Sequence, residues 1–414
     1  MRSNYKRLGD YIEPCNEKNT GNLIKELRGI SNQKFFQKAK TNTIGIDLSK
    51  YRVVRTGQFA FNRATTRNGD KISIALREKE DCIVSPSYRM FKSKDENVLN
   101  SEYLMMWFRR PEFDRYARFK SHGSAHEFFD LDEMYEVELP IPSIEKQRAI
   151  VKEYNTIVNR IKLNEQLNQK LEETAQALYK HWFVDFEFPN ENGQPYKSSG
   201  GEMVYNEELD QEIPLGWILK NLSELVENDS PITYGVVKPG EEDPNGVKLV
   251  RSGDIKNGKV LINDLRTITI EVSNEYKRTK LNGGELLIAI VGNPGEVAIA
   301  PKTLQGSNIA RQVAVIRINS LSLSLFVKNT LCSDLGKSIL KNIILGSVQE
   351  VINLSDLRDV KIPIPTSQIL DKYTKYSLPL HEHMEALFVE TGLNIELKEI
   401  VLARMSKSEK LVTA

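Results

Sequence analysis

The chain has 414 residues, with 57 lysines and arginines against 56 aspartates and glutamates. At roughly 100–200 residues per domain, this length predicts two or three domains, each with its own core. No run of 18 apolar residues occurs, which excludes a membrane-spanning helix. The N-terminal residues lack an apolar signal region, so we expect no secretory signal. Three widely separated cysteines argue against a disulfide framework, so we expect a cytoplasmic protein that contacts no membrane.

The balanced total hides a basic first segment. Residues 1–120 carry 25 basic and 14 acidic residues, whereas residues 121–143 carry no lysine or arginine and six acidic residues. This asymmetry is typical of a polyanion-binding domain beside a solvated joint. A solvated surface with chance clustering of charge is the alternative. Short β-branched runs broken by Gly or Asn predict a β-rich domain over residues 1–143.

A long helix follows this domain. The segment Ile144–Phe183 has no Pro or Gly, and its apolar positions recur at alternating steps of four and three, the period of a coiled coil. Asn164 and Asn168 fall on the predicted seam, where polar residues fix the register of a partner helix. We therefore expect a central coiled-coil helix over residues 144–188 and an exposed linker, rich in Gly, Ser, Asn and Glu, over residues 189–213.

The second half of the chain repeats the first. A second β-rich domain is predicted over residues 214–366 and a C-terminal coiled-coil helix over residues 367–414, interrupted in its pattern by Pro379 and Gly392. Residues 123–143 align without gaps with residues 346–366, with 8 identities in 21 positions. We expect an α+β fold with an internal pseudo-twofold repeat and two antiparallel helices. The alternative is that each helix packs only on its own domain.

Motifs for catalysis or metal binding are missing from the sequence. It has no phosphate-binding GxxxxGK[ST] loop, no GxSxG elbow and no cysteine pair at zinc spacing. The turn Asn293–Glu296 lacks the second proline and the aromatic residue of an adenine-methyltransferase NPPY loop. We expect no cofactor or metal in this chain, and a role in binding.

Several segments, taken together and in order, resemble one known family. They are TGQFAFNR and CIVSPSYRMF in the first domain, GGELLIAIVGNPGEVAIA and SNIARQVAVIR in the second, the doubled PIP exits, and ALYKHWFVDFEFPNENGQPYKSSGGEMV followed by EIPLGWILKNLSELV after the first helix. The chain resembles the specificity subunit of a Type I restriction–modification system over nearly its whole length.

The resemblance implies a function and a set of partners. Each β-rich domain is then a target-recognition domain that reads one half of an asymmetric, bipartite double-stranded DNA sequence, and the helices set the spacer between the halves. Two methyltransferase subunits that bind S-adenosylmethionine and two restriction–translocase subunits that use ATP and Mg²⁺ are the implied partners. The chain itself is implied to be non-catalytic. A coiled-coil scaffold that binds no DNA and a self-contained DNA methyltransferase are the alternatives.

Polar and basic turn segments are the candidate DNA-binding sites, because Arg, Lys, Asn, Gln and Ser read base edges and phosphates. The candidates in the first domain are Arg28, Ser31, Asn32, Gln33, Lys34, Asn62, Arg63, Thr65, Arg67, Asn68, Tyr88 and Arg89. Those in the second domain are Arg251, Ser252, Asp254, Lys256, Asn257, Asn293, Asn308, Arg311 and Gln312.

An aromatic cluster after the first helix is a candidate partner surface. Tyr179, Trp182 and Phe183 represent it, and together with the helices they are expected to bind the methyltransferase subunits. The alternative is that these rings form part of the core against the second domain.

Overall fold

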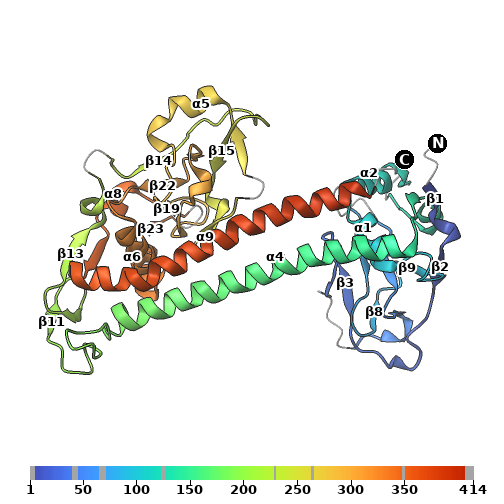
Figure 1. Cartoon of the computed structure of the whole chain (residues 1–414), viewed down its shortest axis with the longest axis horizontal. Coiled ribbons are helices and arrows are strands. Elements are labelled where there is room, and N and C mark those ends of the chain that lie inside the picture. Colours follow the sequence, from blue (N-terminus) through green and yellow to red (C-terminus); the bar gives the residue numbers. More distant parts are fainter. Residues whose placement is uncertain are drawn as a thin grey trace, which may run out of the picture. The chain divides into compact units, whose positions relative to one another are not determined.

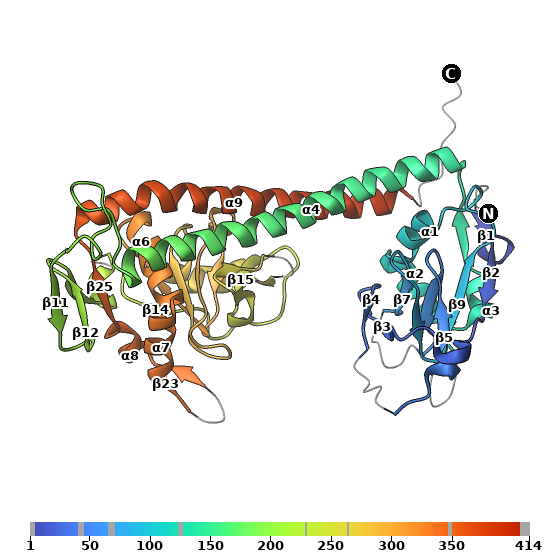
Figure 2. The same cartoon turned by 90° about the horizontal axis from the view of Figure 1, so that it is seen from below.

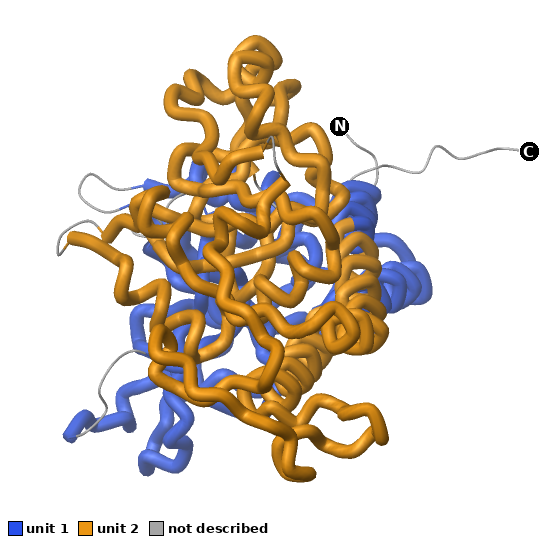
Figure 3. The backbone as a smooth tube through the Cα atoms, turned by 90° about the vertical axis from the view of Figure 1, so that its left-hand side faces the viewer, with its two compact units in different colours: residues 1–162, 393–414 blue, residues 163–392 orange. Residues whose placement is uncertain are grey.

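A computed structural model of the chain describes residues 5–39, 45–64, 71–122, 127–227, 230–262, 265–346 and 350–405. The chain forms two compact units, residues 1–162 with 393–414 and residues 163–392 (Figure 3). We refer to them as unit 1 and unit 2. Each unit holds one β-rich domain and part of each of two long helices, α4 (Ile144–Tyr179) and α9 (Ser367–Arg404).

The domain of unit 1 is built on a four-stranded antiparallel sheet of order β2-β9-β6-β7. Its strands are β2 (Ile12–Cys15), β9 (Tyr88–Ser93), β6 (Phe59–Asn62) and β7 (Ile74–Leu76). The smaller pairs are β1 (Tyr5–Arg7) with β10 (Glu138–Pro140), β3 (Arg28–Ile30) with β4 (Phe36–Lys38), and β5 (Arg52–Val54) with β8 (Cys82–Val84). Phe59 and Phe91 stack at 4.8 Å between ring centroids in the core.

Three helices complete this domain: α1 (Ser101–Phe108), α2 (Pro111–Lys120) and α3 (Leu131–Tyr135). Each begins at a residue type that favours a helix start. The Asn100 side chain accepts a hydrogen bond from the backbone N–H of Tyr103, Pro111 opens α2, and Asp130 forms a capping box with Glu133 at α3. α1 is buried along most of its length because it lies between the sheet and the long helices.

Unit 2 repeats this plan in the same chain order. Its sheet has the order β14-β22-β19-β20, with strands β14 (Thr233–Tyr234), β22 (Val313–Ile316), β19 (Leu286–Ala289) and β20 (Val297–Ile299). The pair β13 (Ile218–Asn221) and β25 (Lys361–Ile364) corresponds to β1 and β10. The helices α6 (Leu321–Cys332), α7 (Asp334–Asn342) and α8 (Leu354–Arg358) correspond to α1, α2 and α3. The predicted internal repeat is therefore present in the fold.

Further strands and one helix extend the second domain. They are β15 (Val247–Val250), β16 (Ile255–Lys256), β17 (Lys259–Val260), β18 (Arg266–Ile268), β21 (Asn308–Ile309), β23 (Ile344–Leu345), β24 (Val351–Ile352) and α5 (Ile270–Glu275). β15 pairs with β21 in parallel, and the bridge Leu27–Ile83 repeats this parallel contact in unit 1.

The predicted linker contains ordered structure. Residues 189–213 include β11 (Met203–Asn206) and most of β12 (Gln211–Pro214), which form an antiparallel hairpin. The ring of Tyr196 stacks on that of Phe188 at 4.6 Å, and the Tyr196 hydroxyl donates to the carbonyl of Glu202. The polar composition therefore reflects the exposure of this segment, while a few aromatic contacts fold it against unit 2.

The two long helices are antiparallel, because in each unit the start of one meets the end of the other (Figures 1 and 2). In unit 1, Val151 and Tyr154 of α4 share a buried cluster with Leu402 of α9. In unit 2, Tyr373 of α9 lies 5.8 Å from Trp182, which follows α4 in a π-helical turn, η4 (Lys180–Val184). The helix α9 continues through Pro379.

Candidate nucleic-acid interface

Basic residues form a row across the small strands of unit 1. Lys38 of β4 is the cross-strand partner of Arg28 in β3, and Lys18 bridges to Arg52 in β5. Val84 of β8 lies between Arg28 and Arg52. It pairs with Arg52, and the residues that precede Val84 and Arg28, Ile83 and Leu27, form a parallel bridge. Residues in register on neighbouring strands point to the same face. We call Lys18, Arg28, Lys38 and Arg52 the cationic row.

The geometry and charge of the cationic row suit contact with a polyanion. Strands lie about 4.8 Å apart, so four steps across the row span roughly 19 Å. Lys18 and Lys38 are exposed and the two arginines are half-buried. Within the described residues, the buried Nε atoms of Arg28 and Arg52 have no hydrogen-bond partner, and Glu26 forms an ion pair with Arg28. The exposed cations of the row are therefore the two lysines at its ends, whereas Val84 at its centre is fully buried in the core with Ile30 and Val54.

Sequence reasoning found only Arg28 of this row. Lys18, Lys38 and Arg52 lie in three short segments that are far apart in the chain and carry no motif. Only the pairing of the strands brings these residues together, so the regional excess of basic charge was the single signal for them.

Lys34 corrects one of the predictions. It lies at the tip of the β3–β4 hairpin with only 6% of its surface exposed, and its Nζ is 2.7 Å from Oδ1 of Asp114 in α2. The same Nζ donates to the carbonyl of Phe108 at the end of α1. Burial lowers the pKa of Lys34, and the charge of Asp114 opposes this shift. Lys34 anchors the hairpin to the helices, so we remove it from the proposed DNA contacts.

Arg63 and Arg89 converge on one carboxylate. Arg89 donates to both oxygens of Asp130 at 2.7 and 3.1 Å, and Arg63 lies 3.3 Å from Oδ2 of the same residue. Burial acts to raise the pKa of Asp130, but the hydrogen bonds from Arg89 and the backbone outweigh it and lower the pKa overall. Both arginines are therefore held in fixed orientations beside the start of α3. Their side chains keep 37% and 27% of their surface exposed.

The candidate loops of the second domain lie together. Asn257 (φ 51°) and Gly258 (φ 77°) form the turn between β16 and β17, and the backbone N–H of Asn257 donates to Glu296 at 2.9 Å. Gly292 (φ 90°) lies against Ser252, whose Oγ is 3.0 Å from the position that a Cβ would occupy. The loops 251–258 and 292–296 thus form one surface region of unit 2.

Two candidates of the second domain are buried. Asn308 has no exposed surface, because its Nδ2 donates to the carbonyl of Tyr276 at 3.1 Å and its Oδ1 accepts from Ser273 at 2.7 Å. Asp254 is 8% exposed and binds the guanidinium of Arg251 through both oxygens at 3.2 Å. Asn308 joins strand β21 to helix α5, so we remove it from the proposed DNA contacts. Asp254 orients the side chain of Arg251.

The other candidates divide by exposure. Those with exposed side chains are Asn32, Gln33, Arg251, Lys256, Asn257, Asn293 and Arg311. Those that are half-buried are Arg28, Ser31, Asn62, Arg63, Tyr88, Arg89, Ser252 and Gln312. The predicted contacts Thr65, Arg67 and Asn68 lie outside the described residues.

The aromatic residues after α4 are core residues. Tyr179, Trp182 and Phe183 are between 4% and 5% exposed and share one buried cluster with residues of the second domain. The ring of Phe183 lies 4.9 Å from Phe326 of α6 and 4.8 Å from Tyr373 of α9. The prediction of an exposed aromatic surface is therefore wrong, and the core alternative is correct. The same rings join α4, α9 and the second domain within unit 2.

Within the described ranges, no group of three or more His, Cys, Asp or Glu residues is placed to hold a metal ion. In the same part of the chain, none of the helices combines the length and the apolar character that a membrane crossing needs.

Comparison with known proteins identifies the family. The family model of the Type I restriction modification DNA specificity domain matches residues 16–173 and 214–384, once in each copy of the repeat. The chain belongs to this Type I specificity family. The resemblance seen in the sequence is thereby confirmed, and with it the fold of two β-rich target-recognition domains joined by two long helices.

Individual relatives in the family are distant. The Type I restriction enzyme EcoBI specificity subunit of Escherichia coli is 29% identical over 235 residues, which cover 55% of this chain and 48% of that protein. The MjaIX specificity subunit of Methanocaldococcus jannaschii is 29% identical over 310 residues, or 73% of this chain and 67% of that protein. The chain thus matches about half of the first relative's length and two thirds of the second's.

A solved family structure has the same fold. The S subunit of a Type-I restriction-modification system from M. genitalium superposes with a TM-score of 0.55 at 13% identity, over 98% of this chain and 96% of that one. At this identity the match concerns the fold.

Proposed function

We propose that this chain selects the DNA target of a Type I restriction–modification complex, with each β-rich domain reading one half of a bipartite double-stranded sequence. The observation that carries the proposal is the doubled family match on a doubled fold. Because the aligned turns differ, with Ser31–Phe35 in one copy and Asn257–Gly258 in the other, the two halves of the target differ in sequence.

The chain acts without catalysis of its own in this proposal. Two methyltransferase subunits bind the helices, take up S-adenosylmethionine and methylate adenine, and two restriction–translocase subunits supply the ATP-dependent steps with Mg²⁺. Support comes from the missing phosphate-binding and NPPY loops and from the family of the chain. The place of action is the cytoplasm.

The cationic row supplies phosphate contacts for the first half-site. The logarithm of the DNA-binding constant falls linearly with the logarithm of the salt concentration, and each phosphate contact that is lost makes this slope shallower by about 0.9. Lys18→Gln with Arg52→Gln should therefore reduce the slope by up to about 2 and weaken binding to all sequences alike. A base-reading residue such as Gln33 behaves differently, because Gln33→Ala should relax one position of the target and leave the slope nearly unchanged.

The test is a methylome. The chain is expressed with the methyltransferase subunit encoded beside it, and N6-methyladenine is mapped by long-read sequencing, with the chain omitted as the control. A gapped, two-part motif that requires this chain supports the proposal. If purified chain with methyltransferase binds DNA without salt dependence and yields no motif, the scaffold alternative replaces it. If the chain alone binds S-adenosylmethionine and methylates DNA, the alternative of a self-contained DNA methyltransferase replaces the proposal.

As a matched control for the cationic row we choose Arg115→Gln. Arg115 lies on α2 in the same unit, with a side chain that is 71% exposed and outside the row. Its substitution should leave the salt slope of the complex unchanged. An equal loss of slope in this control would show that any surface charge of unit 1 suffices, and would refute the assignment to the row.

A further inference from the structure

Three consecutive residues of α6 carry buried hydrogen bonds to the long helices. Lys328 Nζ lies 2.6 Å from Glu172 Oε1 in α4. Asn329 donates to the Tyr373 hydroxyl of α9 at 2.8 Å and accepts from Gln176 of α4 at 3.3 Å. The Tyr179 hydroxyl donates to Thr330 Oγ1 at 3.0 Å. We call Lys328, Asn329 and Thr330, with these four partners, the polar ladder.

The ladder is buried on the side of α6. Lys328, Asn329 and Thr330 are between 1% and 6% exposed. Their partners Glu172, Gln176 and Tyr179 are spaced four and three residues apart, so they share one face of α4. Burial acts to raise the pKa of Glu172, but the charge and hydrogen bond of Lys328 outweigh it and lower the pKa overall. Sliding α6 along α4 by one residue would leave these buried groups unpaired, which is costly.

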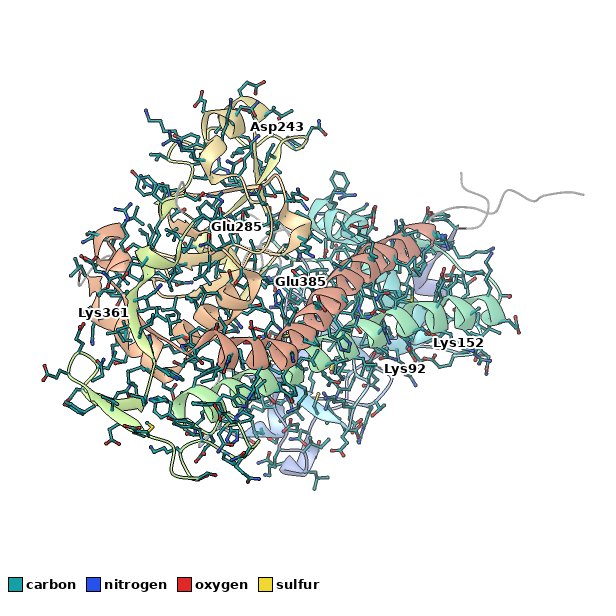
Figure 4. All side chains as sticks on the ribbon, turned by 60° about the vertical axis from the view of Figure 1, so that its left-hand side comes forward. Lys92, Lys152, Asp243, Glu285, Lys361 and Glu385 are labelled. Carbon is teal, nitrogen blue, oxygen red and sulfur yellow. The ribbon has the colours of Figure 1, made fainter. Side chains whose placement is uncertain are left out.

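A small cavity borders the first contact of the ladder. It has a volume of about 70 Å³ and is lined in part by Glu172, Lys328, Asn168 of α4, and His381 and Glu385 of α9. Glu385 lies on the ribbon of α9 in Figure 4. Unfilled space therefore borders the Lys328–Glu172 pair on one side, while the apolar contacts of α6 lie at other residues, such as Phe326 against Phe183.

In the first domain the three ladder positions are apolar, and the polar contacts of α1 with α4 lie elsewhere, at Glu102 with Asn155 and at Arg109 with Tyr154. With the repeat offset of 223 residues, Lys328, Asn329 and Thr330 correspond to Met105, Met106 and Trp107 of α1. These three are buried in an apolar cluster with Val151 and Tyr154 of α4 and Leu402 of α9. Apolar side chains accept many relative positions at similar free energy, whereas buried polar pairs accept few. At these three positions the two copies therefore use different chemistry, although aromatic rings of α4, α6 and α9 also pack beside the ladder in unit 2.

We propose that the polar ladder is a positioning device that fixes the second domain at one register on the long helices. Given the proposed function, its consequence is the choice of gap, because the position of the domain on the helices sets where its half-site is read. Glu172, Lys328 and Asn329 are thus positioning residues for gap length, and the residues that read bases are separate from them.

The test removes the ladder without leaving buried charge. Glu172→Leu combined with Lys328→Met replaces both partners by apolar side chains of similar size, a change that often leaves stability unchanged. We expect the methylome of this variant to keep both half-sites. Methylation of sites whose gap is one base pair longer or shorter should be about tenfold more frequent than in the wild type, as a loss of ~1.4 kcal/mol of positional preference predicts. A second pair, Tyr179→Phe with Thr330→Val, removes only hydroxyl groups and should act in the same direction.

The matched control is Glu173→Leu with Lys337→Met. Glu173 and Lys337 are exposed residues on α4 and α7, so the control makes the same substitutions outside the ladder. It should keep the wild-type gap. Wild-type gap discrimination in both ladder variants would overturn the proposal.

A measurement without DNA separates this inference from the proposed function. Hydrogen exchange of the α6 backbone amides should be about tenfold faster in the Glu172→Leu, Lys328→Met variant than in the control, while α1 exchanges at the wild-type rate. If the wild type yields no gapped motif, the proposed function fails, and the exchange rates still decide whether the ladder holds α6. Equal α6 exchange in variant and control would overturn the ladder.

Discussion

The buried pair Lys34–Asp114 allows a sharp test of structure against sequence. The turn-rich sequence around Lys34 suggests a DNA contact, whereas the structure gives it side-chain exposure of 5% beside an Asp114 side chain at 10%. Lys34→Met would leave the Asp114 carboxylate buried without its partner and the carbonyl of Phe108 without the donor it has in the wild type. Breaking a buried ion pair from one side costs about 3–5 kcal/mol.

The expected effect is large compared with the stability of a domain, which is about 5–15 kcal/mol. For a unit of this size, 1 kcal/mol moves the melting temperature by about 2–4 °C, so the transition of unit 1 should fall by about 6–20 °C. Calorimetry of the full chain, with hydrogen exchange to assign the transition to unit 1, measures it. The double variant Lys34→Met, Asp114→Leu should recover most of the loss, because neither charge is then left unpaired.

The DNA readout decides between the two interpretations. In the part of the molecules that is folded, Lys34→Met should leave the salt slope of DNA binding unchanged. An unchanged melting temperature together with a slope reduced by about 0.9 would refute the structural assignment and restore Lys34 as a phosphate contact.

Three further predictions follow from buried or paired groups. Asn308→Leu should destabilise unit 2 by about 1–3 kcal/mol without changing the methylated motif, since it leaves the Ser273 hydroxyl without its acceptor and removes one of the donors to the Tyr276 carbonyl; a changed motif would return Asn308 to the interface. Asp130→Ala should cost about 1 kcal/mol as a lost helix cap and make Arg63 and Arg89 more mobile, and the variant should lack the acid-range loss of stability that the wild type shows as the pH falls through the lowered pKa of Asp130. Burial lowers the pKa of His381; the charge of Lys328 acts in the same direction, and the charges of Glu385, Glu172 and Glu382 oppose the shift. The unfolded chain therefore binds the proton more readily than the folded chain, so unit 2 should lose stability as the pH falls below about 6.5. If the melting temperature of His381→Gln fell as steeply with acid as that of the wild type, this explanation would be contradicted.

Patterns that repeat along the chain predicted the architecture well. The coiled-coil period gave α4, and Asn164 and Asn168 are buried at 1% and 8% as the seam positions require. The doubled Pro exits mark β10 and β25, the strands that lead into the long helices. Such features are local or periodic, so the sequence alone carries them.

The candidate interface was harder to predict because exposure depends on long-range packing. Lys34 lies in a polar turn and Asn308 in the short strand β21, and each is buried against a partner distant in the chain: Asp114 is 80 residues from Lys34, and Ser273 is 35 residues from Asn308. The cationic row shows the reverse, since its residues have unremarkable neighbours in the chain and meet only through strand pairing. Aromatic residues at the end of α4 gave no sign of which side they face until α6 and α9 were placed beside them.

The return of α9 to unit 1 has a consequence for biosynthesis. The buried cluster that contains Met105 and Tyr154 also includes Val401, Leu402 and Met405 at the end of α9. The apolar surface of α1 and α4 in unit 1 is therefore covered only after the end of α9 has been synthesised. A ribosome has by then made about four hundred residues, including all of the second domain. A nascent chain that stalls inside α9 would therefore expose an apolar face near its beginning, where chaperones and proteases recognise incomplete proteins.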